Sequence, residues 1–128
     1  MLSVLRIKNF AIIEEIEVEF SPGLNALTGE TGAGKSIILK SIELLSGKRA
    51  SNEIVRKGEK ACEIEGLFEL DEITKEEIKN IAEDLELEDD ELLIRRVIDA
   101  SGRSKVYING KLSTAGLLSH ISEELLDI

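Results

Sequence analysis

The chain has 128 residues, about the size of one domain, and its hydrophobic share of 42% is enough for a core built mainly from Ile, Leu and Val. A single cysteine excludes an internal disulfide, and the absence of a signal peptide and of any membrane-length apolar run predicts a cytoplasmic protein with no membrane contact. The net charge of −10 would disfavour nucleic-acid binding if the acidic residues were evenly spread along the chain.

Two paired strands are predicted at the start of the chain. Residues 2–8 alternate between apolar and polar side chains, and residues 12–20 alternate more regularly. In the second strand we expect one apolar face opposite a row of glutamates; the apolar residues are Ile12, Ile16, Val18 and Phe20. The chain should reverse between the two strands at Asn9, Phe10 and Ala11.

The next segment carries the most informative motif in the chain. Residues 29–36 read Gly-Glu-Thr-Gly-Ala-Gly-Lys-Ser, which is a complete G-x-x-x-x-G-K-S phosphate-binding loop. The apolar run 24–28 before it predicts a buried strand, introduced by a turn at Pro22 and Gly23. Apolar residues repeat at helical spacing behind it, and Gly47 offers a left-handed helix stop. Strand, glycine-rich loop and helix form the context that the motif requires, so the motif predicts a nucleotide-phosphate site.

Each part of the motif has a separate chemical role. The glycines let successive backbone N–H groups turn toward an anion, and the start of the helix adds its unpaired N–H groups and its dipole. Lys35 can reach the β- and γ-phosphates, and the Ser36 hydroxyl can ligate Mg²⁺. The residues expected to hold the nucleotide are Gly29, Glu30, Thr31, Gly32, Ala33, Gly34, Lys35, Ser36 and Ile37.

The charge is concentrated in one segment. Residues 69–91 hold twelve acidic and two basic residues, which gives this acidic segment the charge of the whole chain. Residues 48–60 instead carry a local excess of basic residues over Glu53 and Glu59. The acidity is therefore confined to an insertion and does not surround the phosphate motif.

The second half of the chain predicts further strands and short helices. Residues 61–70 alternate as a half-exposed strand, and we expect a helix in the acidic segment with Thr74 as its N-cap. Glu77 would complete its capping box, and Ile73 and Ile78 would form a hydrophobic staple. The apolar stripe expected on this helix is Ile78, Ile81, Ala82 and Leu85.

Two hairpins and a last helix follow the acidic segment. Residues 92–98 and 104–108 read as strands joined by a turn at 100–103, and Asn109-Gly110 marks a second tight turn. Ser113 is expected to cap a final helix, and residues 125–128 resemble the start of another strand. Together these elements predict an α/β fold with a mixed sheet and not a regular doubly wound chain.

Four strings of residues resemble the N-terminal half of an ATP-binding-cassette ATPase head of the SMC/RecF type. They are residues 5–13, 23–37, 47–51 and 102–110. The resemblance covers essentially the whole chain, so residues 1–128 are expected to be one lobe of a P-loop NTPase head with an antiparallel β subdomain. Position 11 departs from the family: many such heads carry a basic residue there that contacts adenine, and this chain has Ala11.

The resemblance implies a function and a set of partners. It implies an ATPase that binds ATP and Mg²⁺, with Lys35 as the catalytic lysine, and that acts in recombinational repair of DNA double-strand breaks. The implied partners are the C-terminal half of the same head, a second head that joins on ATP binding, and DNA. For DNA, the expected contacts are the basic residues Lys48, Arg49, Arg56, Lys57 and Lys60.

Several parts of an ATP-hydrolysing site of this class are missing. Asp99 and Asp127 follow runs that contain charged residues, so neither ends a convincing Walker B strand. No signature loop follows either, and we therefore expect residues 1–128 to be inactive alone. Two alternatives remain open: a self-contained small P-loop kinase, and a nucleotide-binding interaction module that contacts a partner through its acidic segment.

Overall fold

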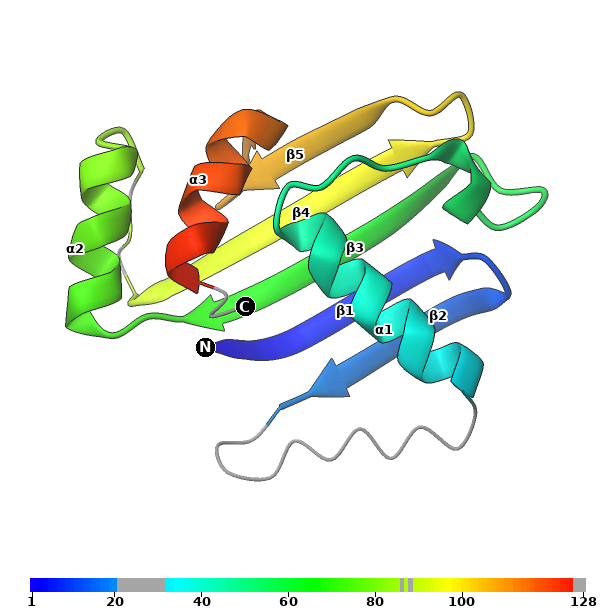
Figure 1. Cartoon of the computed structure of the whole chain (residues 1–128), viewed down its shortest axis with the longest axis horizontal. Helices are drawn as coiled ribbons and strands as arrows, with labels where there is room; N and C mark the ends of the chain where they lie inside the picture. Colours follow the sequence, from blue (N-terminus) through cyan, green and yellow to red (C-terminus); the bar gives the residue numbers. More distant parts are fainter. Residues whose placement is uncertain (21–31, 86, 88, 126–128) are drawn as a thin grey trace.

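One antiparallel sheet is the framework of the chain (Figure 1). The computed structural model describes residues 1–20, 32–85, 87 and 89–125. The strands of this part of the chain are β1 (Leu2–Phe10), β2 (Ile13–Glu19), β3 (Ala61–Glu69), β4 (Glu91–Asp99), β5 (Ser104–Ile108) and β6 (Lys111–Ser113). The helices are α1 (Gly32–Leu45), α2 (Glu72–Ile81) and α3 (Ala115–Leu125), with a short 3₁₀ turn at Asn52–Ile54. The strands lie in the order β2-β1-β3-β4-β5-β6, and each neighbouring pair is antiparallel.

The fold class is confirmed by the described part of the chain. The predicted mixed sheet required a strand at residues 24–28, and these residues lie outside the described part of the chain. All six strands within the described part are antiparallel, so they correspond to the predicted antiparallel β subdomain.

The first hairpin forms as predicted, except at its turn. β1 and β2 pair with Ile7 opposite Ile16, and both Asn9 and Ala11 adopt left-handed backbone conformations where the chain reverses. The turn includes Ile12, whose side chain is 75% exposed, so the prediction that Ile12 shares the apolar face of β2 is wrong. Alternation describes a strand only where the backbone is extended, and at residue 12 it is not.

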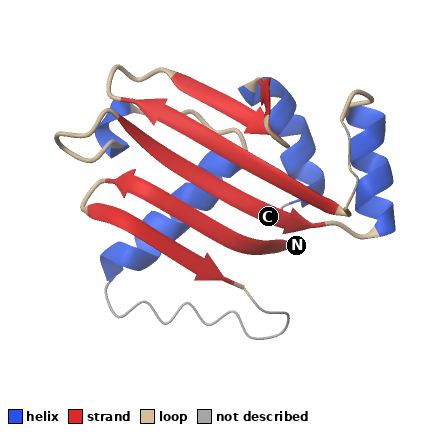
Figure 2. Ribbon diagram, turned by 180° about the vertical axis from the view of Figure 1, so that it is seen from behind, coloured by secondary structure: helices blue, strands red, loops and turns tan. Residues whose placement is uncertain are grey.

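The helices α1 and α3 cover the same face of the sheet, and the opposite face is open (Figures 1 and 2). Alternate residues of the central strands point into the layer between sheet and helices, including Leu5, Ile64, Phe68 and Ile94, all fully buried. Cys62 belongs to this core, and burial raises the pKa of its thiol to about 12, which keeps it protonated and unreactive.

On the open face of the sheet, ion pairs join charged side chains of neighbouring strands. Arg6 of β1 lies 3.1 Å from Glu17 and 3.5 Å from Glu65, on the two neighbouring strands. Arg95 pairs with Glu63 and lies over the ring of Tyr107, 5.3 Å from its centroid. Cross-strand pairs of this kind stabilise the register of a sheet with one face in water.

The helix of the acidic segment begins three residues earlier than predicted. Asp71 is the N-cap, and its carboxylate accepts a 2.7 Å hydrogen bond from the Thr74 N–H, which lowers the pKa of Asp71. Thr74 therefore lies inside α2, and the predicted capping box is wrong. The staple is also wrong, because Ile73 is 71% exposed while Ile78 is buried. α2 ends at Ile81, which is 38% exposed, so the prediction that Ala82 and Leu85 continue its apolar stripe is wrong, although both are half-buried.

The last elements are close to prediction. β4 and β5 form the expected hairpin, and Asn109 and Gly110 both have positive φ in the turn that leads to β6. Ser113 belongs to β6, so its predicted role as a cap is wrong; the hydroxyl of Thr114 accepts the Leu117 N–H instead, at 3.1 Å. Leu125 ends α3 and does not begin a strand, and residues 126–128 lie outside the described part. None of the described helices is long and apolar enough to cross a membrane.

Candidate functional site

The phosphate motif leads directly into α1. The helix begins at Gly32, so the second half of the motif forms its first turns, while Gly29, Glu30 and Thr31 lie outside the described residues. Lys35 and Ser36 are exposed. This arrangement joins the motif to a helix start, where backbone N–H groups and the helix dipole favour an anion.

The next residues of α1 fix which side of the helix faces outward. Ile37 and Ile38 are 8% and 6% exposed and belong to the core cluster. Ile37 was predicted to contact the nucleotide, and its buried side chain leaves only its backbone for that contact. Ser41 is fully buried one turn further on, where its hydroxyl bonds to the Ile37 carbonyl of the same helix at 2.8 Å.

The opposite end of α1 is held by a residue that sequence reasoning missed. Arg96 is one of the charged residues that interrupt the run before Asp99, but its side chain is buried and donates to the carbonyls of Leu44, at the end of α1, and of Lys48, which follows the helix. The burial of Arg96 could have been predicted from its place in the strand. Every second residue of β4 lies on the covered face, and Arg96 is in step with Leu92, Ile94 and Ile98.

The carboxylate of Asp99 accepts hydrogen bonds within the turn between β4 and β5. Its Oδ1 accepts hydrogen bonds from the Ser101 hydroxyl at 2.6 Å, the Ser101 N–H at 3.0 Å and the Arg103 N–H at 2.9 Å. The Ser101 hydroxyl is the largest cause of the lowered pKa of Asp99. Asp99 therefore stabilises the turn that follows β4; that it is not a hydrolytic carboxylate stays a prediction, and Asp127 lies outside the described residues.

The predicted basic residues do not form one patch. Lys48 and Arg49 follow α1 after Ser46 and Gly47. The chain then runs along the sheet to a loop beside the β1–β2 turn, where the others lie (Figure 1). Arg56 has a structural contact there, because its guanidinium donates to the Ile12 carbonyl at 2.7 Å and its N–H donates to the Asn9 carbonyl at 2.9 Å. Lys57 and Lys60 are exposed.

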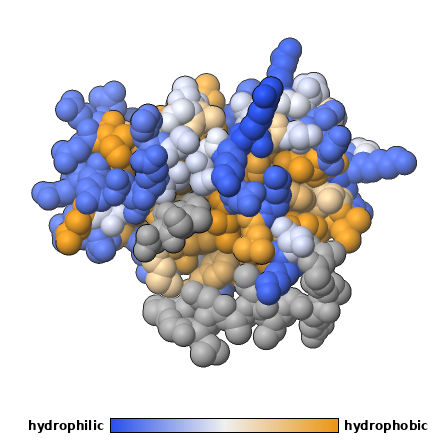
Figure 3. All heavy atoms as spheres, viewed as in Figure 1, coloured by the Kyte–Doolittle hydropathy of each residue, from blue (hydrophilic) through white to orange (hydrophobic). Residues whose placement is uncertain are grey.

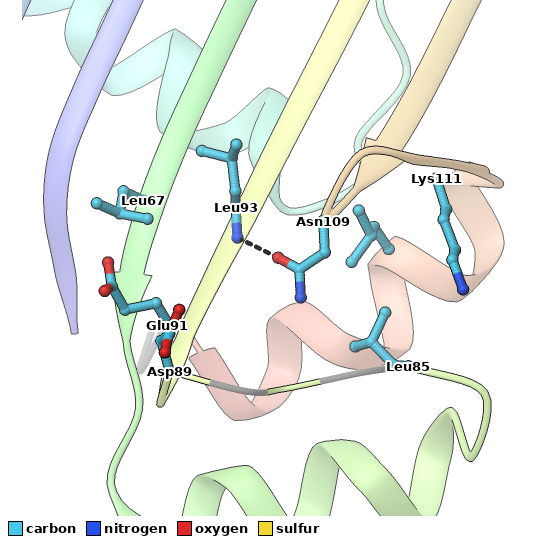
Figure 4. A pocket seen from close by; sticks show the side chains of 8 residues that line it. Leu67, Leu85, Asp89, Glu91, Leu93, Asn109 and Lys111 are labelled. Atoms are coloured by element: carbon cyan, nitrogen blue, oxygen red, sulfur yellow. Dashed lines mark hydrogen bonds between the residues drawn. The ribbon is translucent and has the colours of Figure 1, made fainter.

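A surface hollow lies at the other end of the sheet. It has a volume of about 350 Å³ and includes Leu67, Leu93 and Asn109 in its lining (Figure 4). The Asn109 side chain points across it and accepts the Leu93 N–H at 2.8 Å. The start of α1 lies at the opposite end of the sheet, so this hollow is separate from the phosphate motif (Figure 1).

Comparison with known proteins gives consistent sequence matches. The model of the family described as AAA domain matches residues 5–125. The chain is 50% identical over 128 residues to the DNA repair protein RecN of Halalkalibacterium halodurans and 49% identical over 130 residues to that of Bacillus subtilis. Each match covers 100% of this chain, which spans only 23% and 22% of the length of these two relatives.

Solved structures with the same fold include ATPase heads of the predicted type. An SMC ATPase studied for ATP-driven dimerization and DNA-stimulated activation superposes with a TM-score of 0.76 and 23% identity, over 96% of this chain and 78% of that one. The recombination mediator RecF superposes with a TM-score of 0.71 and 22% identity, over 92% of this chain and 29% of that one. The predicted resemblance to SMC/RecF-type heads is therefore confirmed.

Proposed function

Because the chain belongs to the AAA domain family, we propose that residues 29–36 bind the triphosphate of ATP, with Lys35 on the β- and γ-phosphates and the Ser36 hydroxyl on Mg²⁺. The observation that carries this proposal is the exposed position of both side chains at the start of α1. Mg²⁺ would supply charge neutralisation between the phosphates, and the backbone N–H groups of the helix start would hold the anion.

We further propose that residues 1–128 are the N-terminal lobe of an ATPase head that acts in recombinational repair of DNA double-strand breaks in the cytoplasm. The similarity to RecN supports a role in DNA repair, because these relatives are DNA repair proteins. They are about four times as long as this chain, which is why we propose that it is one lobe of a larger head. Catalysis then depends on the C-terminal half of the head and on a second head that joins when ATP binds.

The exposed apolar surface over α1 supports the proposal that another part of the protein packs against this lobe. Leu39 on α1 is 51% exposed, and apolar atoms gather in the middle of the face that carries the helix (Figure 3). An apolar surface of this kind is stabilised when another part of the protein covers it. The C-terminal half of the head is the proposed cover.

The experiment for this proposal compares ATP turnover by purified residues 1–128 with turnover by the full-length protein. We expect hydrolysis by the full-length protein and none above background by residues 1–128, because the described residues offer Asp99 only as a turn residue. Fast hydrolysis by residues 1–128 that is lost in Lys35→Ala would show that the lobe carries a complete site.

DNA contact is proposed for the exposed basic residues after α1. The positive charges of Lys48, Arg49, Lys57 and Lys60, together with Arg56, are suited to phosphate contacts that do not depend on base sequence. Arg56 is a poor choice for testing, because its replacement would also break its bond to the Ile12 carbonyl.

The test is double charge reversal at Lys57 and Lys60 in the full-length protein. Each lost phosphate contact should reduce the slope of log affinity against log salt by about 0.9 on duplex DNA. Lys111→Glu is the matched control, since Lys111 is equally exposed but lies beside the hollow at the other end of the sheet. An unchanged slope in the double variant, or an equal change in the control, would contradict the DNA proposal.

A further inference from the structure

The C-terminal end of α1 is tied to two elements that are distant in sequence. Arg96 of β4 reaches it from the sheet: its Nη1 donates to the Leu44 carbonyl at 2.7 Å and also to the Lys48 carbonyl. The Nε of the same guanidinium donates to the Ser104 hydroxyl at 2.9 Å. One side chain therefore connects the end of the helix to both β4 and β5.

The burial of Arg96 makes this contact unusual. The residue is 2% exposed, and none of the ion pairs among the described residues involves it. Burial lowers the pKa of its guanidinium, which shows that the surroundings disfavour the charge. The partial negative charge at the C-terminus of α1 offsets that cost; the Leu44 carbonyl there accepts from Arg96 as well as from the Gly47 N–H.

A second contact joins the same helix end to α3. The Ser122 hydroxyl lies 2.9 Å from the Ser46 carbonyl, which follows the last residue of α1, and 2.9 Å from the Ser119 carbonyl of its own helix. Ser122 is 6% exposed. The backbones are close here as well, because a Cβ added at Gly47 would lie 2.9 Å from the Ser119 nitrogen.

We infer that Arg96 and Ser122 are positioning residues for the nucleotide site, acting through α1 from its far end. A helix of 14 residues moves as one body, so a constraint at its C-terminus also restricts the place and tilt of the turn that carries Lys35 and Ser36. Both residues contact the chain at the opposite end of α1 from Lys35 and Ser36. This inference rests on the proposed binding of Mg²⁺–ATP by that motif.

The test measures the dissociation constant of Mg²⁺–ATP for the full-length protein and its variants, at a temperature where circular dichroism shows each to be folded. Arg96→Met removes every donor at nearly constant length, and we expect about a 10-fold weaker affinity, because a displaced helix start would weaken a charge-assisted hydrogen bond to the phosphates. Arg96→Lys keeps one cationic donor, and Ser122→Ala loses its own contact but leaves that of Arg96 in place, so about a 3-fold loss is expected for each.

Ser41→Ala is the matched control. Ser41 is buried in the same helix, but its hydroxyl bonds only within α1, so its loss should lower stability and change the affinity by less than about 2-fold. If Arg96→Met does not fold, Arg96→Lys and Ser122→Ala decide the question.

Two results overturn the inference in distinguishable ways. Unchanged affinity in the folded Arg96 and Ser122 variants, with only their unfolding midpoints lowered as in Ser41→Ala, would show that the contacts are merely structural. Failure of the wild-type protein to bind ATP would overturn the proposed function and this inference together.

Discussion

Replacing Lys35 with alanine is expected to weaken the binding of Mg²⁺–ATP to the full-length protein by about 30-fold or more, because a charge-assisted contact to the phosphates is lost. Lys35 is exposed in the first turns of α1, so truncating it leaves the core residues Ile37 and Ile38 in place. Isothermal titration calorimetry measures the change, with circular dichroism as the check on folding.

Lys40→Ala is the control for this variant. Lys40 is an exposed lysine on the same helix, and its partner is Glu43 at 3.7 Å, an exposed pair that contributes little to stability. We expect its affinity for ATP to stay near that of the wild type. Equal losses in the two variants would mean that general positive charge, and not the motif lysine, attracts the nucleotide.

Replacing Gly47 with alanine is expected to cause a large loss of stability. Gly47 has φ of +93°, and an added Cβ would lie 2.9 Å from the Ser119 nitrogen and 3.0 Å from the Ala115 carbonyl oxygen. Both atoms belong to the backbone of α3 and cannot rotate away. Backbone strain and overpacking together should cost about 3 kcal/mol, measured by urea denaturation of the full-length protein.

Gly58→Ala separates the two causes. Gly58 has nearly the same φ of +90°, but an added Cβ would have nothing within 4 Å. Its substitution should therefore cost only the backbone strain, about 1 kcal/mol. If both alanine variants lose the same stability, the close approach of α1 to α3 is not what requires glycine at position 47.

Elements with a strong local signal could be predicted from the sequence. The hairpin of β4 and β5 follows from two strand-like runs separated by the turn residues 100–103, and the turn at Asn109-Gly110 follows from the readiness of both residues to adopt positive φ. The motif at residues 29–36 also predicted the start of α1, because its phosphate-binding role requires a helix directly behind the glycines.

The errors lie where tertiary contacts choose between local alternatives. Asp71 and Thr74 are both good N-caps by type, and the helix begins at the first because β3 ends just before it. Thr114 and Ser113 present the same choice, decided by the pairing of Ser113 with Val106 in the sheet.

The Arg96 contact could not be predicted in full. Strand parity placed this residue on the covered face, but its partners are carbonyls 52 and 48 positions away in sequence. A buried arginine is usually paired with a carboxylate, and such a pair can be sought among the acidic residues of a sequence. The acceptors of Arg96 are instead backbone carbonyls at and just after the end of a helix. Only the packed structure brings them together.

The location of a bound nucleotide tests the central claim most directly. A crystal structure of the full-length protein with Mg²⁺ and a slowly hydrolysed ATP analogue should place the triphosphate at the start of α1, with Lys35 on the phosphates and Ser36 on the metal ion. A nucleotide bound elsewhere, such as in the hollow beside Leu93 and Asn109, with Lys35 out of contact, would contradict the assignment of this site.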